Sequence, residues 1–370
     1  MDSNKKVHFK NLDGLRFIAA FVVILFHSGL INDYYKGNAV NIYKSYFTRG
    51  SGVGVDLFFS LSGFLITFLL LKEIEKTATV SVKTFYLKRI LRIWPLYFGL
   101  GVLGILLGPI ILNKINPASA LMTSEQNWIN MFFLCTFTVN FQINSVFMNT
   151  GVIGTFWSVC IEEQFYILWA PLIKWFKGNL LIFLLVITMI GVVCAATMTP
   201  VIAYYFTLCR FLNFGIGALA AWVYYKEQKE NTTIFPRWMF LPSVQILVIA
   251  LSLLYLFNVG TSGIGTRAEF FINPIASMYV ILIAIQPNAV LNLENRMFRY
   301  LGKISYGIYM FHPFCVQISA RIAAKFLPIL GDTLYYFFWL LPLGSVIIVA
   351  ALSYEIFEKP FLKIKDKYSN

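Results

Sequence analysis

The chain of 370 residues is 58% hydrophobic and only 13% charged, and its mean hydropathy is +0.71. Since a soluble domain carries roughly 25% charged residues, this composition excludes an ordinary water-soluble protein and indicates that most of the surface faces lipid. The net charge of +13 comes from basic residues in short connectors between apolar runs, without a nucleic-acid motif, so the expected partners are lipid headgroups and cytoplasmic phosphates and no nucleic acid.

Ten apolar stretches are long enough to cross a bilayer, for which a helix needs about 20 mainly apolar residues. They cover residues 14–31, 53–72, 94–112, 156–175, 179–198, 203–225, 239–258, 270–286, 304–323 and 334–356. A shorter apolar piece, 129–141, is expected to be re-entrant or interfacial. The sequence therefore predicts an all-α fold, a polytopic transmembrane helix bundle of about ten spans.

The chain is expected to form one integral-membrane domain over residues 1–370, with no appended soluble domain. No internal repeat and no Pro/Gly/Ser linker divides it. The basic N-terminus is followed by an apolar run without a small-residue cleavage site. This predicts a retained first helix rather than a signal peptide.

The distribution of lysine and arginine predicts the orientation of the bundle. With the N-terminus inside, 22 of the 30 basic residues lie on the cytoplasmic side, seven lie on the other side, and Arg210 falls within a span. Cytoplasmic loops carry an excess of Lys and Arg. Both termini are therefore expected to be cytoplasmic, and merging or splitting two spans would preserve this result.

The first span, DGLRFIAAFVVILFHSG, carries Arg16 and His27. They are eleven residues apart, so their directions differ by about 20° and roughly 17 Å of helix separates them. Ionisable groups inside a span are costly and are candidates for function. Arg16 is expected near the cytoplasmic rim, with an interfacial anchor as the alternative. His27 is expected at or beyond the midplane as a general base, with a hydrogen bond between helices as the alternative.

The second span opens with RGSGVGVDLFFSLSGFLIT, in which Asp56 and several small residues interrupt the apolar run. Asp56 is expected to orient an imidazole or a hydroxyl, with a solvated helix end as the alternative. Small residues such as Gly63 allow neighbouring helices to approach closely, which is a purely structural explanation for them.

The connector before the third span ends in KTFYLKRILRIWPLYF. Arg89 and Arg92 are at positions i and i+3, so they project to neighbouring positions on one helical face, and Lys88 is adjacent. Two guanidiniums at a membrane surface can bind phosphates in a bidentate manner. The alternative is positive-inside anchoring to lipid phosphate.

The fourth span, TFWSVCIEEQFYILWAPLI, contains two adjacent acids, Glu162 and Glu163. Adjacent helical residues point about 100° apart, so at most one of them faces a given cavity. The ninth span, GKISYGIYMFHPF, contributes Tyr309 and His312. A histidine directly before a proline is also explained as the structural partner of a helix kink.

The five cysteines are scattered in apolar surroundings and form no C-x-x-C pair. With only three histidines in the chain, no metal site is expected. The cysteines are read as small buried hydrophobic residues.

Six segments, in order over nearly the whole chain, resemble the bacterial acyltransferase-3 family of integral membrane O-acyltransferases. They are LDGLRFIAAFVVILFH, GVDLFFSLSGFLIT, FYLKRILRIWPLY, TFWSVCIEEQFYILW, GKISYGIYMFH and SYEIFEKPFLK. Each segment is weak evidence alone, but six in register are specific. The resemblance implies an enzyme of the bacterial inner (cytoplasmic) membrane.

The resemblance implies transfer of an acyl group, often acetyl, from cytoplasmic acyl-CoA to a hydroxyl of a cell-envelope carbohydrate or lipid-linked sugar. Acyl-CoA, with acetyl-CoA expected, is then a co-substrate, and no bound cofactor is expected. Some family members carry an extracytoplasmic hydrolase-like domain that receives the acyl group. This chain is expected to acylate its acceptor directly or through a separate protein.

The resemblance also implies residue roles. His27 matches the catalytic residue and Arg16 its paired arginine. Arg89 and Arg92 match a motif thought to hold the CoA end. Glu162, in preference to Glu163, matches the acid of the WS-x-x-x-E pattern.

The residues alone leave two other classes of function open. The first is a proton-coupled transporter or permease of an envelope precursor, in which His27 and Glu162 relay protons. The second is a membrane-embedded assembly partner without turnover. The cytoplasmic arginine pair favours a phosphorylated cytosolic ligand and therefore the enzyme.

Overall fold

Helices account for all regular secondary structure in the parts of the chain that the structure, a computed structural model, describes. These parts are residues 9–28, 51–115, 124–143, 151–258, 267–330 and 335–368. The α-helices are α1 Leu12–His27, α4 Ser51–Thr77, α5 Val82–Ile115, α6 Ser124–Cys135, α7 Val139–Ile143, α8 Trp157–Trp175, α9 Leu180–Thr197, α10 Pro200–Tyr205, α11 Thr207–Glu230, α12 Pro242–Asn258, α13 Glu269–Ala284, α14 Arg296–Lys303, α15 Ser305–Leu330, α16 Tyr335–Ser353 and α17 Lys359–Lys367. Short 3-10 helices occupy η3 Gly151–Phe156, η4 Lys177–Asn179 and η5 Arg237–Phe240, and a π-helical turn occupies η7 Tyr354–Glu358.

Every predicted span falls on helical segments, although some bounds differ, and the predicted span 203–225 covers two helices, α10 and α11, that are separated at Phe206. The predicted third span begins at residue 94, whereas α5 begins at Val82 and includes the arginine pair. The helix therefore carries the cations continuously into the bundle, because KTFYLKRILRI contains no helix breaker. The C-terminal part of the first predicted span lies outside the described residues. The short apolar piece at 129–141 folds as α6 and α7 joined by a turn, and neither helix is long enough to span a bilayer.

Five helical segments in the described ranges are long and apolar enough to cross a membrane on their own. They are Gly52–Thr77, Val82–Gly108, Lys177–Thr197, Thr207–Glu230 and Leu340–Lys367. Helix α9 exposes a continuous set of large apolar side chains, including Ile182, Val186 and Met189. Water does not favour such a surface, so lipid contact is its natural environment. The all-helical fold is thus confirmed in the described ranges, with five candidate membrane-spanning helices, while the count of about ten spans and the orientation stay predictions.

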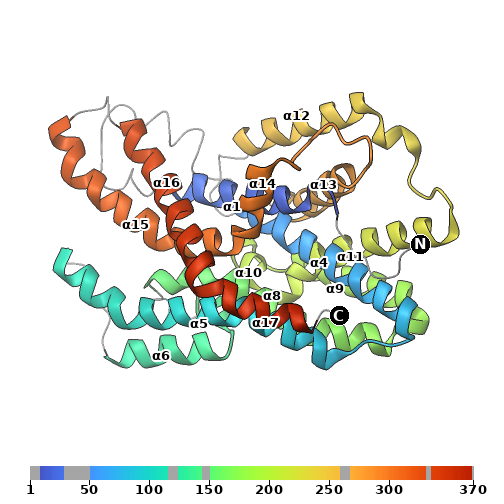
Figure 1. Cartoon of the computed structure of the whole chain (residues 1–370), viewed down its shortest axis with the longest axis horizontal. Helices are drawn as coiled ribbons and strands as arrows, with labels where there is room; N and C mark the ends of the chain where they lie inside the picture. Colours follow the sequence, from blue (N-terminus) through green and yellow to red (C-terminus); the bar gives the residue numbers. More distant parts are fainter. Residues whose placement is uncertain are drawn as a thin grey trace.

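The centre of the bundle is built from α1, α4, α8 and α11. In Figure 1, α12 lies along the top edge and α5 with α6 along the bottom edge, with α1 and α4 between them. Helix α4 packs most extensively against α11, and α11 in turn packs against α9. Helix α1 packs against α4, α14 and α15. Helix α1 therefore has neighbours on several sides, as a helix that carries ionisable groups into the interior requires.

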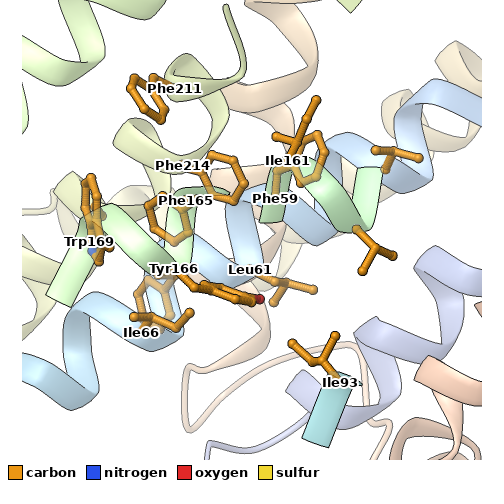
Figure 2. Close-up of a cluster of buried hydrophobic side chains, with 14 of the residues drawn as sticks. Phe59, Leu61, Ile66, Ile93, Ile161, Phe165, Tyr166, Trp169, Phe211 and Phe214 are labelled. Atoms are coloured by element: carbon orange, nitrogen blue, oxygen red, sulfur yellow. The ribbon is translucent and has the colours of Figure 1, made fainter. Parts of the chain in front are cut away.

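Aromatic side chains fill the space between α4, α8 and α11. Figure 2 shows Phe165 of α8 next to Phe214 of α11, and their rings stack with centroids 4.0 Å apart. Tyr166, the next residue of α8, points away from this pair toward Leu61. One face of α8 is therefore anchored in an apolar core, and the adjacent face is free to line a site.

Two glycines allow the close approach of α4 and α11. A Cβ atom on Gly63 would overlap the backbone carbonyl of Phe214, and one on Gly217 would overlap the backbone carbonyl of Ser60. The expectation that small residues serve close packing is confirmed at Gly63.

Substitution Gly217→Ala should lower the free energy of unfolding by about 1–3 kcal/mol, because backbone atoms cannot move aside for the methyl group as a side chain would. Thermal unfolding of the detergent-purified protein measures this. The matched control is Gly178→Ala, since nothing lies within 4 Å of a Cβ at that position. Equal melting temperatures for the two variants would contradict the packing argument.

Candidate active site

A cavity of about 320 Å³ lies between α1, α4, α5, α8 and α15. Its lining combines apolar side chains, most of them from α4, with charged and hydroxyl-bearing side chains from all five helices. The charged and hydroxyl-bearing residues are Asp13, Arg16, Ser62, Arg89, Arg92, Ser158, Glu162, Tyr166, Ser305, Tyr306 and Tyr309. Such a mixture of apolar walls and convergent polar groups is typical of a ligand site.

Three arginines occupy one end of this cavity. Arg16 comes from the first turns of α1, and Arg89 with Arg92 from the first three turns of α5. The side chain of Arg16 forms an ion pair of 3.4 Å with Asp13 and is 22% exposed. The structure therefore brings Arg16 together with two arginines that lie more than seventy residues later in the sequence, and the carboxylate of Asp13 lies beside Arg16.

Arg89 is held by aromatic rings rather than by an acid. Its guanidinium lies 5.5 Å from the ring centroid of Phe85 and 5.4 Å from that of Tyr166. Its Nε is buried and has no hydrogen-bond partner among the described residues. A buried donor without a partner is costly unless a ligand supplies the acceptor. Lys88, the third cation expected here, does not line the cavity.

Glu162 faces the cavity and Glu163 does not. The Glu162 carboxylate accepts hydrogen bonds from Ser62 Oγ at 2.8 Å and from the Tyr166 hydroxyl at 3.1 Å. Glu163 is buried and accepts a bond of 2.9 Å from Trp94 Nε1 on α5. The sequence leaves open which of the two acids faces the cavity, and the structure places Glu162 there, because adjacent helical residues point to different neighbours.

The polar lining continues inward along α8 and α15. Ser158 Oγ and the Tyr309 hydroxyl are hydrogen-bonded at 2.5 Å, and both line the cavity. Tyr306, one turn before Tyr309, donates to the backbone oxygen of Ile93 at 2.9 Å. Hydroxyl groups therefore extend from the acid at Glu162 to the first two turns of α15.

His27 lies beyond this inner end, at the last residue of α1. Its Nδ1 is 2.8 Å from the backbone oxygen of Val23. Its ring is 5.0 Å from the ring of His312 on α15, and the ring of His312 is 5.2 Å from that of Tyr309. His27 itself does not line the cavity. The order from the arginines inward is therefore Glu162, then Tyr309, His312 and His27.

Asp56 belongs to a different cluster from the one expected for it. Its carboxylate binds Arg210 Nη1 at 2.8 Å, Asn213 Nδ2 at 3.0 Å and Asn273 Nδ2 at 2.7 Å. The hydrogen bonds that it makes within the described residues thus go to α11 and α13 and not to His27. The expectation that Asp56 orients an imidazole is revised accordingly. The reason is that Arg210, a buried cation on α11, requires an anion beside it.

Several lining residues did not stand out in the sequence as parts of the site, namely Ser62, Ser158, Tyr166 and Tyr306. On α8 a signal existed, because Ser158, Glu162 and Tyr166 follow one another at four-residue spacing and so form one stripe. No comparable pattern identifies Ser62, whose bond to Glu162 joins residues 100 positions apart.

Comparison with known proteins identifies the family to which the chain is related. A profile of the family described as "Acyltransferase domain" matches residues 9–354. The chain is 26% identical to the peptidoglycan O-acetyltransferase OatA of Listeria monocytogenes, over 95% of this chain and 56% of that protein. It is 25% identical to a putative O-acetyltransferase of Staphylococcus aureus strain COL, over 97% of this chain and 58% of that protein.

A third relative is the putative peptidoglycan O-acetyltransferase YrhL of Bacillus subtilis, which is 26% identical over 95% of this chain and 55% of that protein. The chain therefore spans little more than half the length of these curated relatives. No solved structure matches the chain.

Proposed function

The chain belongs to the acyltransferase-3 family described as "Acyltransferase domain", and from this premise we propose that it is a membrane O-acyltransferase. It transfers an acyl group, with acetyl as the expected group, from cytoplasmic acyl-CoA to a hydroxyl of a cell-envelope carbohydrate or lipid-linked sugar. Its place is the bacterial inner membrane. The similarity to a peptidoglycan O-acetyltransferase and to a putative peptidoglycan O-acetyltransferase supports an envelope glycan as the acceptor.

The observation that carries this proposal is the cavity that joins three arginines to an acid and a row of hydroxyls. The CoA end of the donor carries several phosphate charges, and guanidinium groups bind phosphate in a bidentate manner. The pantetheine arm is long and narrow, so it suits a cavity whose walls on α4 are largely apolar.

Arg16, Arg89 and Arg92 then hold the phosphates, and Lys88 adds positive charge from the same turn of α5 without touching the ligand. The unpartnered Nε of Arg89 supports this role, because a phosphate oxygen would satisfy it. Asp13 limits the mobility of Arg16 through their ion pair.

His27 acts as the general base. It removes the proton of the acceptor hydroxyl, the hydroxyl oxygen attacks the thioester carbon, and CoA departs as the thiolate, which takes up the proton. Arg16 and His27 stand at opposite ends of one helix, roughly 17 Å apart along its axis. This separation suits a donor whose charged end is held at the rim while the thioester reaches the interior. Glu162 positions the polar lining through Ser62 and Tyr166.

The direct test uses membranes that contain the protein, acetyl-CoA labelled in the acetyl group, and a purified envelope glycan as acceptor. We expect base-labile label in the glycan, in proportion to the amount of the protein. Vesicles loaded with lipid-linked sugar provide the second arm. Movement of the sugar across the bilayer under a proton gradient, without any label transfer, would favour the transporter and overturn the enzyme.

Substitution Arg89→Ala should raise the KM for acetyl-CoA by about 10- to 100-fold, because a hydrogen bond to a charged group contributes about 1.5–3 kcal/mol. The KM for the acceptor should stay unchanged. Initial rates at varied acetyl-CoA measure both. Lys88→Ala is the matched control and should change the KM by a much smaller factor, since Lys88 does not line the cavity. An unchanged KM for acetyl-CoA in Arg89→Ala would instead support the alternative that the arginines anchor the helix to lipid phosphate.

A further inference from the structure

His312 is a buried imidazole beside the half-buried imidazole of His27, and the function proposed above does not use it. Its side chain is 1% exposed, and its ring lies 5.0 Å from that of His27 at an interplanar angle of 61°. The two residues come from α1 and α15, which pack against each other. At this separation of ring centroids, nitrogen atoms of the two rings can come within hydrogen-bonding reach.

The proline after His312 determines how the imidazole is used. In a helix the carbonyl of Tyr309 would accept from the backbone N–H of residue 313, but Pro313 has no N–H. The structure shows that His312 Nδ1 occupies this place and is hydrogen-bonded to the Tyr309 carbonyl. The side chain thus replaces the missing backbone donor, which agrees with the structural explanation given by the sequence.

This bond also sets the tautomer. A carbonyl oxygen only accepts, so Nδ1 of His312 must carry a proton, and in the neutral ring Nε2 then bears an unprotonated lone pair. The same reasoning holds for His27, whose Nδ1 faces the Val23 carbonyl. His312 Nε2 is buried and has no hydrogen-bond partner among the described residues. His312 therefore carries a buried, unprotonated nitrogen without a donor among the described residues, in a ring that lies next to the ring of His27.

We propose that His312 is the partner base of His27, so that the two imidazoles hold one proton between them during acyl transfer. The acceptor O–H bond breaks and the proton moves to His27 Nε2, while the hydroxyl oxygen forms a bond to the acyl carbon. The C–S bond breaks and its electron pair stays on the CoA sulfur. The N–H of protonated His27 is donated to His312 Nε2 until the sulfur takes the proton, which returns both rings to the neutral state.

The physical reason for this arrangement is the low polarity of the surroundings. An imidazolium inside a membrane protein has lost the water that would stabilise its charge. A lone pair that accepts its N–H replaces part of that hydration. His312 acts through His27 and is therefore a positioning residue of the proposed acyltransferase, so the inference rests on the proposed function.

The test distinguishes the effect of losing the Nε2 lone pair of His312 from the effect of losing its structural hydrogen bond to the Tyr309 carbonyl. Substitution His312→Leu removes both. Substitution Pro313→Ala supplies a backbone N–H to the Tyr309 carbonyl, so the double variant His312→Leu/Pro313→Ala restores the structural bond without the lone pair. His312→Gln retains an amide donor for the carbonyl and an oxygen acceptor for His27. All variants are compared in membranes with labelled acetyl-CoA and a purified envelope glycan.

We expect Pro313→Ala alone to be active and the double variant to lose about 100-fold or more in kcat, with the KM for acetyl-CoA unchanged. His312→Gln should recover part of that loss, because its oxygen can accept the N–H of protonated His27. A double variant as active as the wild type would show that His312 serves only the helix and would overturn the inference. Failure of the proposed function is a different result, since the wild type would then transfer no label at all.

Discussion

Replacing His27 by glutamine should reduce kcat for acyl transfer by about 100- to 10,000-fold, the range expected for loss of a general base. The glutamine amide can still donate to the Val23 carbonyl that His27 now faces at 2.8 Å, so the end of α1 should keep its structure. The KM for acetyl-CoA should change little, because the arginines lie at the other end of α1 and on α5. Transfer of label from acetyl-CoA to the glycan measures both constants.

The neighbouring residue provides a matched control for this variant. Ser28 is fully buried and donates to the Ile24 carbonyl at 2.9 Å, as a purely local contact of the same helix end. Ser28→Ala should therefore leave transfer near the wild-type rate. If His27→Gln retained activity within a few-fold of the wild type, the base would have to lie elsewhere, and the pairing with His312 would lose its basis.

The largest effect on stability is expected at Asp56. Asp56→Ala would leave Arg210 as an uncompensated buried charge, since the guanidinium is 1% exposed and aromatic rings surround it. Breaking a buried ion pair by removing one partner costs about 3–5 kcal/mol. The loss of the bonds to Asn213 and Asn273 acts in the same direction, because the carboxylate joins α4 to both α11 and α13. Unfolding of the detergent-purified protein measures the change.

A surface pair serves as the comparison for Asp56. Lys226 and Glu230 approach to 2.6 Å, but their side chains are 35% and 48% exposed. Glu230→Ala should change the free energy of unfolding by no more than about 1 kcal/mol, as for other exposed pairs. If Asp56→Ala were as stable as the wild type but no longer transferred the acyl group, the structural role would be contradicted. Asp56 would then act in catalysis.

The cationic end of the site illustrates what spacing along one helix can predict. Arg89 and Arg92 at i and i+3 were expected on one face of a helix, and both line the cavity. The continuity of α1 from Leu12 to His27 likewise supports the spacing expected between Arg16 and His27. These relations depend only on helical geometry, which is the same in every sequence that forms a helix.

The adjacent acids Glu162 and Glu163 show the limit of prediction from helical geometry alone. Helical geometry predicts that Glu162 and Glu163 diverge, but it does not say which one meets Ser62 and which one meets Trp94. That choice depends on how α8 is rotated against α4 and α5. The rotation follows from packing, in particular from the stacking of Phe165 on Phe214, and such contacts join residues far apart in the chain.

The partners of Asp56 could not be predicted for the same reason. In the sequence it is a polar residue near the start of a span, without a visible partner. The partner, Arg210, lies 154 positions away on α11, where the sequence shows only a charge within a span. Two charges inside a membrane protein stabilise each other only in contact, so neither can be interpreted before the helices are placed together.

By itself, the sequence determined that this protein is an apolar, all-helical chain that suits a membrane. It also determined that Arg16 and His27 lie eleven residues apart on one helix and that Arg89 and Arg92 lie three residues apart on another. Composition and helical period are local properties, which is why they could be read directly. Only the tertiary structure decided that three arginines share a cavity with Glu162, that Asp56 pairs with Arg210, and that His312 meets His27. Those contacts arise from the packing of helices against one another, which no local pattern encodes.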